Sequence, residues 1–96
     1  MLQVWKFQFN AGDHIGDHIS IQMPRGSRIL RFGSQEVDIL TIWALVTPTN
    51  PMITRKLRLV GTGHPINPAE ATCYIGSCET SRGMLVWHLF DTGGEY

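Results

Sequence analysis

The chain alternates apolar and polar residues with a period of two, and this pattern constrains its fold more than any other feature of the sequence. In the first segment, Trp5, Phe7 and Phe9 fall on one side. Lys6 and Gln8 fall on the other side, as in a strand with one buried face. No segment longer than a turn carries the 3.6-residue period of an amphipathic helix. An all-β fold is therefore predicted.

Six or seven short strands are predicted, separated by Gly, Pro, Asn and Ser residues that favour turns. The strands span residues 2–9, 19–23, 28–32, 36–47, 53–60, 72–78 and 84–91, with turns that include 24–27, 33–34 and 48–51. Residues 68–71 could form one helical turn. Segment 36–47 is apolar on both faces, which predicts a strand that is central or covered twice. We expect one domain, residues 1–96, folded as a compact antiparallel sandwich or a small barrel.

The charge balance disfavours one broad class of partner. Eight Lys and Arg residues offset eight Asp and Glu residues, whereas a general nucleic-acid-binding protein needs excess positive charge. Charged residues are only 17% of the chain, against roughly 25% in an average soluble domain. This leaves little repulsion between copies and favours a homo-oligomer. The zero net charge nevertheless conceals a basic middle, residues 21–67, and an acidic end, residues 68–96.

The cellular compartment is inferred from the absence of targeting and membrane segments. Residues 1–10 lack the basic and apolar regions of a signal peptide, and the longest nearly uncharged stretch, 39–53, is too short to span a bilayer. Cys73 and Cys78 are five residues apart and fall on opposite faces of a continuous strand. Two free, buried thiols are therefore predicted rather than a disulfide. These features predict a cytoplasmic protein with no membrane partner.

Six ordered blocks extend over nearly the whole chain. They are Trp-Lys at 5–6, Ile-Gln-Met-Pro-Arg-Gly at 21–26, Trp-Ala-Leu-Val at 43–46, Val-Gly-Thr-Gly-His-Pro-Ile at 60–66, Tyr-Ile-Gly at 74–76 and Leu-Val-Trp-His-Leu-Phe at 85–90. In these blocks the chain resembles a family of small tailed-bacteriophage and prophage proteins of unknown function. The resemblance implies a phage accessory protein in the cytoplasm of an infected bacterium, and it transfers no catalytic residues. The loop at 10–18 is longer here than in the family pattern.

A strand rich in cations runs into a glycine-containing loop, and this stretch is the strongest candidate binding site. Glycines allow the backbone to approach a ligand, and successive N–H groups in such a loop can hold an anion. The arginines of strand 53–60 would pair with the oxygens of the ligand, and two arginines near the 24–27 turn would close the site. The alternative is a tight turn that needs glycine, beside cations that protect a sheet edge. The candidate set is Arg25, Arg28, Arg55, Arg58, Gly61, Thr62, Gly63 and His64.

A tandem repeat at 12–19 is a weaker candidate for a metal site. It places Asp13 with His14, and Asp17 with His18, four residues apart. Imidazole and carboxylate groups suit a divalent ion, but the third ligand and the supporting hydrogen bonds that such sites need are not evident. The alternative is a short duplication in a surface loop. We therefore expect no metal and no cofactor.

The three tryptophans, Trp5, Trp43 and Trp87, are predicted to pack in the core. An exposed tryptophan would instead offer a stacking surface for a base or anchor a subunit interface. His88 is expected in the core or at an interface.

The protein is not expected to be an enzyme, because no nucleophile, base and orienting group can be assembled from the sequence. The leading hypothesis is a non-catalytic phage accessory protein that binds and sequesters an anionic small molecule, such as a nucleotide signal of bacterial anti-phage defence. The phage setting comes from the resemblance. One alternative is a phage factor that inhibits a host protein through a sheet edge or an apolar patch. Another is a hydrolase whose metal is held by His14 and His18.

Overall fold

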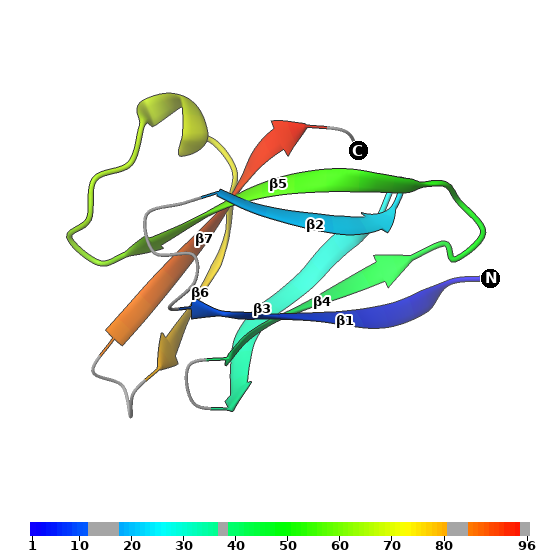
Figure 1. The fold of residues 1–96 in the computed structure, drawn as a ribbon, viewed down its shortest axis with the longest axis horizontal. Coiled ribbons are helices and arrows are strands. Elements are labelled where there is room, and N and C mark those ends of the chain that lie inside the picture. Colours follow the sequence, from blue (N-terminus) through cyan, green and yellow to red (C-terminus); the bar gives the residue numbers. More distant parts are fainter. Residues whose placement is uncertain (12–17, 37–38, 81–84, 95–96) are drawn as a thin grey trace.

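The computed structural model describes residues 1–11, 18–36, 39–80 and 85–94, and its strands form a two-layered sandwich (Figure 1). In this part of the chain there are seven strands and one short 3-10 turn, and no helix is long and apolar enough to cross a membrane. The predicted all-β fold is confirmed, and of the two predicted architectures the structure is the sandwich. The elements are β1 (Gln3–Asn10), β2 (His18–Pro24), β3 (Arg28–Glu36), β4 (Ile39–Val46), β5 (Met52–Gly61), η2 (Pro68–Glu70), β6 (Tyr74–Thr80) and β7 (Leu85–Gly94).

The strands form two antiparallel sheets, and the chain passes repeatedly from one to the other. The three-stranded sheet has the order β1-β4-β3, and the four-stranded sheet has the order β2-β5-β7-β6. The turn at 24–27 carries the chain from β2 to β3 in the opposite sheet. In this turn Gly26 has a φ of 80°, and the N–H of Ser27 donates to the carbonyl of Pro24 at 3.2 Å. On one side of the sandwich, β3 packs against β6 of the other sheet.

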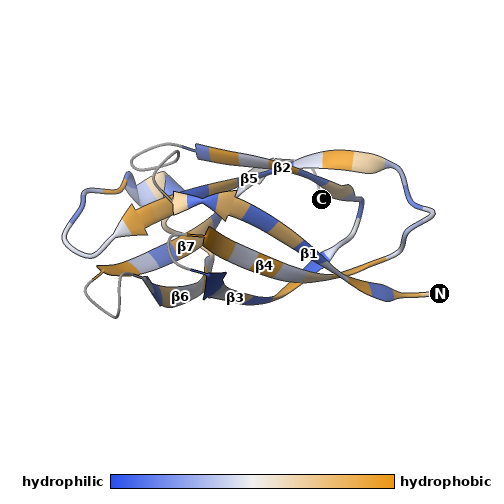
Figure 2. Cartoon of the chain, turned by 60° about the horizontal axis from the view of Figure 1, so that its bottom comes forward, coloured by the Kyte–Doolittle hydropathy of each residue, from blue (hydrophilic) through white to orange (hydrophobic). Residues whose placement is uncertain are grey.

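The core lies between the inward faces of the two sheets. Alternate residues of β4 point into it, and so do alternate residues of β5 and β7 from the other sheet. Figure 2 shows the same alternation as orange and blue bands along strands such as β1. β4 pairs with both β1 and β3, so the prediction of a central strand is confirmed. The fully buried apolar residues of these strands are Leu40, Ile42, Ala44, Val46, Leu57, Leu59 and Leu89.

The predicted turn at 33–34 is wrong, because β3 continues through it to Glu36. Gly33 is buried and paired with Thr41 of β4, and a Cβ atom there would lie at ordinary contact distance, 3.4 Å, from Trp43 Cζ3. The glycine therefore belongs to a regular strand rather than to a reversal of the chain. β4 begins at Ile39 instead of the predicted residue 36, and residues 37–38 lie outside the described chain.

Both cysteines are free, as predicted, but their environments differ. Cys73 is exposed, which corrects the prediction that it is buried, because it precedes β6 instead of lying within a strand. Cys78 is half-buried in β6 and packs against the core. Burial raises the pKa of the Cys78 thiol to about 11.

We expect iodoacetamide at pH 8 to modify Cys73 at least about tenfold faster than Cys78, because only a small fraction of a buried thiol is in the reactive thiolate form. Mass spectrometry of digested protein measures both rates. Cys73→Ser should abolish the fast reaction, and unfolding in urea should accelerate the modification of Cys78. Since the pKa of Cys78 in the folded protein lies above its ordinary value of 9.0, the stability contributed by the protonated thiol is full below pH 9 and declines as the pH rises toward 11. Equal rates for the two thiols in folded protein would contradict this expectation.

Candidate functional site

The glycine loop predicted as a binding site lies at the end of β5 and forms a tight turn. Gly63 has a φ of 88°, and the N–H of His64 donates to the carbonyl of Gly61 at 3.0 Å. A Cβ atom on Gly61 would lie 2.9 Å from His64 Nδ1 and 3.4 Å from Trp87 Cζ3. Glycine at position 61 therefore leaves the space in which the imidazole lies against the strand end.

This loop borders a small hollow of about 110 Å³. Pockets that hold drug-sized ligands measure roughly 300–1,000 Å³. The hollow at the loop can therefore hold a single small group, such as a phosphate or a carboxylate, but not a whole nucleotide. The residues around it are Gly61, Thr62, His64, Leu85, Val86 and Trp87.

His88 lies beside the loop, half-buried on the outer face of the four-stranded sheet. Its Nε2 is hydrogen-bonded to Thr62 Oγ1 at 2.9 Å, and its Nδ1 to the hydroxyl of Tyr74 at 3.2 Å. Both ring nitrogens are thus engaged, which fixes the orientation of the imidazole. Tyr74 carries no sequence signal that links it to this loop, because the contact depends on β6 lying next to β7.

A larger hollow, of about 500 Å³, lies on the outer face of the four-stranded sheet, between η2 and strands β2, β5 and β7. Its polar lining combines an ammonium, an imidazole, two hydroxyls and one carboxylate. The ammonium of Lys56 and the hydroxyl of Ser20 can donate hydrogen bonds to an anion, and the carboxylate can accept one from a sugar or an amine. The lining residues are His18, Ser20, Lys56, Ala69, Glu70 and Thr92.

The segment that covers this hollow is shaped by its own hydrogen bonds. The side chain of Asn67 accepts from the N–H of Ala69 at 3.0 Å, and its carbonyl accepts from the N–H of Glu70 at 2.8 Å. The Glu70 carboxylate then contacts the imidazole of His18 on β2. Beneath it, the Thr92 hydroxyl donates to the carbonyl of Lys56 at 2.8 Å. The contact between residues 18 and 70 joins the η2 segment to the far edge strand of the sheet.

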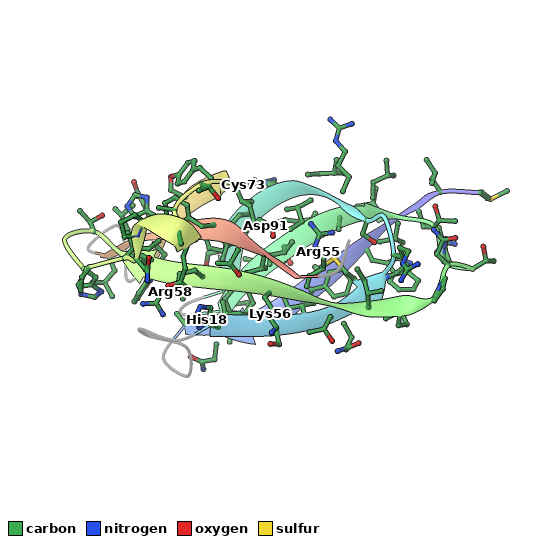
Figure 3. The ribbon with its side chains drawn as sticks, turned by 90° about the horizontal axis from the view of Figure 1, so that it is seen from above. His18, Arg55, Lys56, Arg58, Cys73 and Asp91 are labelled. Carbon is green, nitrogen blue, oxygen red and sulfur yellow. The ribbon has the colours of Figure 1, made fainter. Side chains whose placement is uncertain are left out.

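Arg55 faces the interior and does not belong to a solvent-facing site, contrary to the prediction. Its guanidinium is 4% exposed and lies 2.8 Å from Asp91 Oδ2, and it donates to the carbonyl of Ser27 at 2.7 Å. Figure 3 shows Arg55 and Asp91 directed toward each other. The physical reason is the alternation along β5, which puts Arg55 on the same face as the buried Leu57.

The other predicted arginines do not gather around the loop. Arg58 is half-buried and occupies an outward position of β5, near Lys56 and His18 (Figure 3). Arg25 lies in the turn at 24–27, and Arg28 follows it. The backbone N–H of Arg25 donates to the carbonyl of Pro51, just before the start of β5. Since β5 runs from residue 52 to residue 61, the two arginines are about 30 Å from the glycine loop. They therefore cannot close the predicted site.

The metal hypothesis rests mainly on residues 12–17, including His14, which lie outside the described chain. His18 is described, and it contacts Glu70. Among the residues that the structure places, no group of three or more His, Cys, Asp or Glu side chains could hold a metal ion.

The fold and the site define a small all-β sandwich protein with one hollow on the outer face of its four-stranded sheet and a smaller one at the end of β5. The chain belongs to the DUF7352 family, a domain of unknown function whose model matches residues 1–95. No curated protein and no solved structure matches the chain.

Proposed function

We propose that the protein binds an anionic small molecule, without catalysing a reaction, in the hollow between η2 and the four-stranded sheet. The observation that carries this proposal is the volume of about 500 Å³ together with the lining by Lys56, His18, Ser20 and Thr92. A volume of this size falls within the usual range of ligand pockets. Ammonium groups form their strongest hydrogen bonds with phosphate or carboxylate oxygens.

Strand β5 offers a direction in which a longer ligand could extend. Arg58 follows Lys56 on its outward face, and Thr62 and His64 border the smaller hollow at its end. Six residues separate Lys56 from Thr62, a span of about 20 Å in a strand. A mononucleotide would therefore occupy the larger hollow alone, and only a longer molecule would reach the glycine loop.

A nucleotide is the anionic molecule that we propose. The size of the larger hollow supports it, and so does the resemblance to phage proteins, since host defence against phages uses nucleotide signals. On this proposal the protein is a phage accessory protein that sequesters such a signal in the cytoplasm of the infected bacterium. The low content of charged residues supports association of several copies.

The test is a panel of mono-, di- and cyclic nucleotides, measured by the shift in Tm and then by calorimetry. We expect at least one nucleotide to raise the Tm, and Lys56→Ala to weaken its binding about tenfold or more, the effect of losing one charge-assisted hydrogen bond. Arg25→Ala removes one positive charge from the exposed turn at 24–27, at the opposite end of β2 from His18, and is the matched control. A panel that leaves the Tm unmoved, or equal effects of the two variants, would reject the proposed site.

The alternative function is inhibition of a host protein through an edge strand. β1 pairs only with β4, without a bulge, and exposes Val4 on its surface. Such an edge can add a strand from another chain. A host protein that co-purifies in stoichiometric amount, together with a negative nucleotide panel, would favour this alternative.

A further inference from the structure

The outer face of the three-stranded sheet carries a row of three side chains that the strand order brings together. Lys6 of β1 and Arg31 of β3 both pair with Trp43 of the central strand β4. Ile42 and Ala44, on either side of this tryptophan, are fully buried, so Trp43 projects to the opposite, outer face. The row therefore consists of a partly exposed indole with an exposed cation on each side.

The centre of this row is a cation–π contact. The guanidinium carbon of Arg31 lies over the Trp43 ring, 5.0 Å from its centroid. Gly33 lies next to both groups, at the distance of ordinary contact: a Cβ atom there would lie 3.4 Å from Trp43 Cζ3 and 3.6 Å from Arg31 Nε. The surface at the middle of the sheet is thus an aromatic ring covered by a planar cation, which favours stacking of a further planar group.

The charge of this sheet is one-sided. Its three strands contain three cations, Lys6, Arg28 and Arg31, and one described acid, Glu36. Within the described residues none of the three cations forms an ion pair, and Lys6 instead donates to Gln35 Oε1 at 3.1 Å. The cations are therefore available to an external anion, although the net charge of the whole chain is zero.

We infer that this face binds single-stranded nucleic acid. A base stacks on the Arg31 and Trp43 platform, and Lys6 and Arg28 contact the flanking phosphates. An acidic polypeptide would satisfy the cations but would leave the planar platform without a planar partner. Duplex bases are already stacked on each other, so the single strand is the form that fits. This inference is independent of the proposed function, which uses the other sheet.

The test is the fluorescence anisotropy of a labelled 12-nucleotide oligothymidylate titrated with the full chain. With two phosphate contacts, from Lys6 and Arg28, we expect log K to fall against log salt with a slope of about −1.4. Arg31→Glu and Trp43→Leu should each weaken binding at least about fivefold, the effect of losing one base stack. Arg31→Lys keeps the positive charge but removes the planar guanidinium, and it should also weaken binding.

Ser77→Glu adds a negative charge to the exposed surface of β6 in the opposite sheet, outside both hollows, and it should leave oligonucleotide binding within about twofold. Thermal unfolding of each variant verifies that it is folded, and Arg31→Lys still tests the inference if Trp43→Leu does not fold. The inference is overturned by the absence of binding at 20 mM salt, by equal losses in Ser77→Glu and Arg31→Glu, or by full binding in Arg31→Lys. Equally tight binding of poly-glutamate that competes with the oligonucleotide would assign the face to an acidic protein instead.

Discussion

Asp91→Ala is expected to lower the free energy of unfolding by about 3–5 kcal/mol, the effect of leaving one partner of a buried ion pair uncompensated. Arg55 is 4% exposed and Asp91 is 6% exposed, with 2.8 Å between Arg55 Nη2 and Asp91 Oδ2. Without the carboxylate, the guanidinium keeps the carbonyl of Ser27 but loses its counter-charge in a region from which water is excluded. Small domains have unfolding free energies of about 5–15 kcal/mol, so this variant loses a large share.

Urea unfolding followed by tryptophan fluorescence measures this loss. Glu79→Ala removes an exposed carboxylate from β6 and is the matched control, with an expected change within about 0.5 kcal/mol. The double variant Arg55→Met, Asp91→Leu should recover most of the stability, because apolar residues of similar volume avoid the cost of burying charge. A loss below about 1 kcal/mol in Asp91→Ala would show that the pair is not the electrostatic contact described here.

Leu89→Ala is expected to lower the free energy of unfolding by about 2–5 kcal/mol, through lost burial and a cavity. Leu89 is fully buried, and it pairs with Leu59 of β5 and Gly76 of β6. Gly76 has no side chain to fill the space, and a Cβ atom there would already lie 3.8 Å from Phe32 Cβ of the other sheet. Neighbouring groups can therefore collapse into the cavity only in part.

Leu30→Ala provides the comparison for the same chemical change. Leu30 lies on β3 and is 47% exposed, so its truncation should cost less than about 1 kcal/mol. The two variants are measured in the same urea titration. Similar losses for both would mean that Leu89 does not occupy the core position described for it.

The burial of Arg55 could have been predicted from the sequence. It has the same parity as Leu57 and Leu59, so alternation along the strand already places it inward. Its partner was not predictable, since Asp91 lies 36 residues further along and the pair forms only because β5 and β7 are neighbours. Asp91 shares the parity of the buried Leu89, so its inward direction was also contained in the pattern.

The lining of the larger hollow, in contrast, could not be predicted from the sequence. Alternation along β5 places Lys56 outward, but its association with Glu70 and Thr92 has no signal in the local pattern. The segment 62–72 folds back over the sheet through the contact of Glu70 with His18. These two residues are 52 positions apart in the chain, and the alternation of apolar and polar residues does not predict the path of the loop between strands.

Alternation is a local property, because each strand buries its own apolar face. The all-β class, the central position of β4 and the turn at 24–27 therefore follow from the order of residues alone. The order of strands within each sheet is a different matter. Any strand with one apolar face can bury it beside any other, so the pattern does not choose neighbours. Only the tertiary structure decides that Lys6, Trp43 and Arg31 form one row, and that Arg25 and Arg28 lie far from the glycine loop.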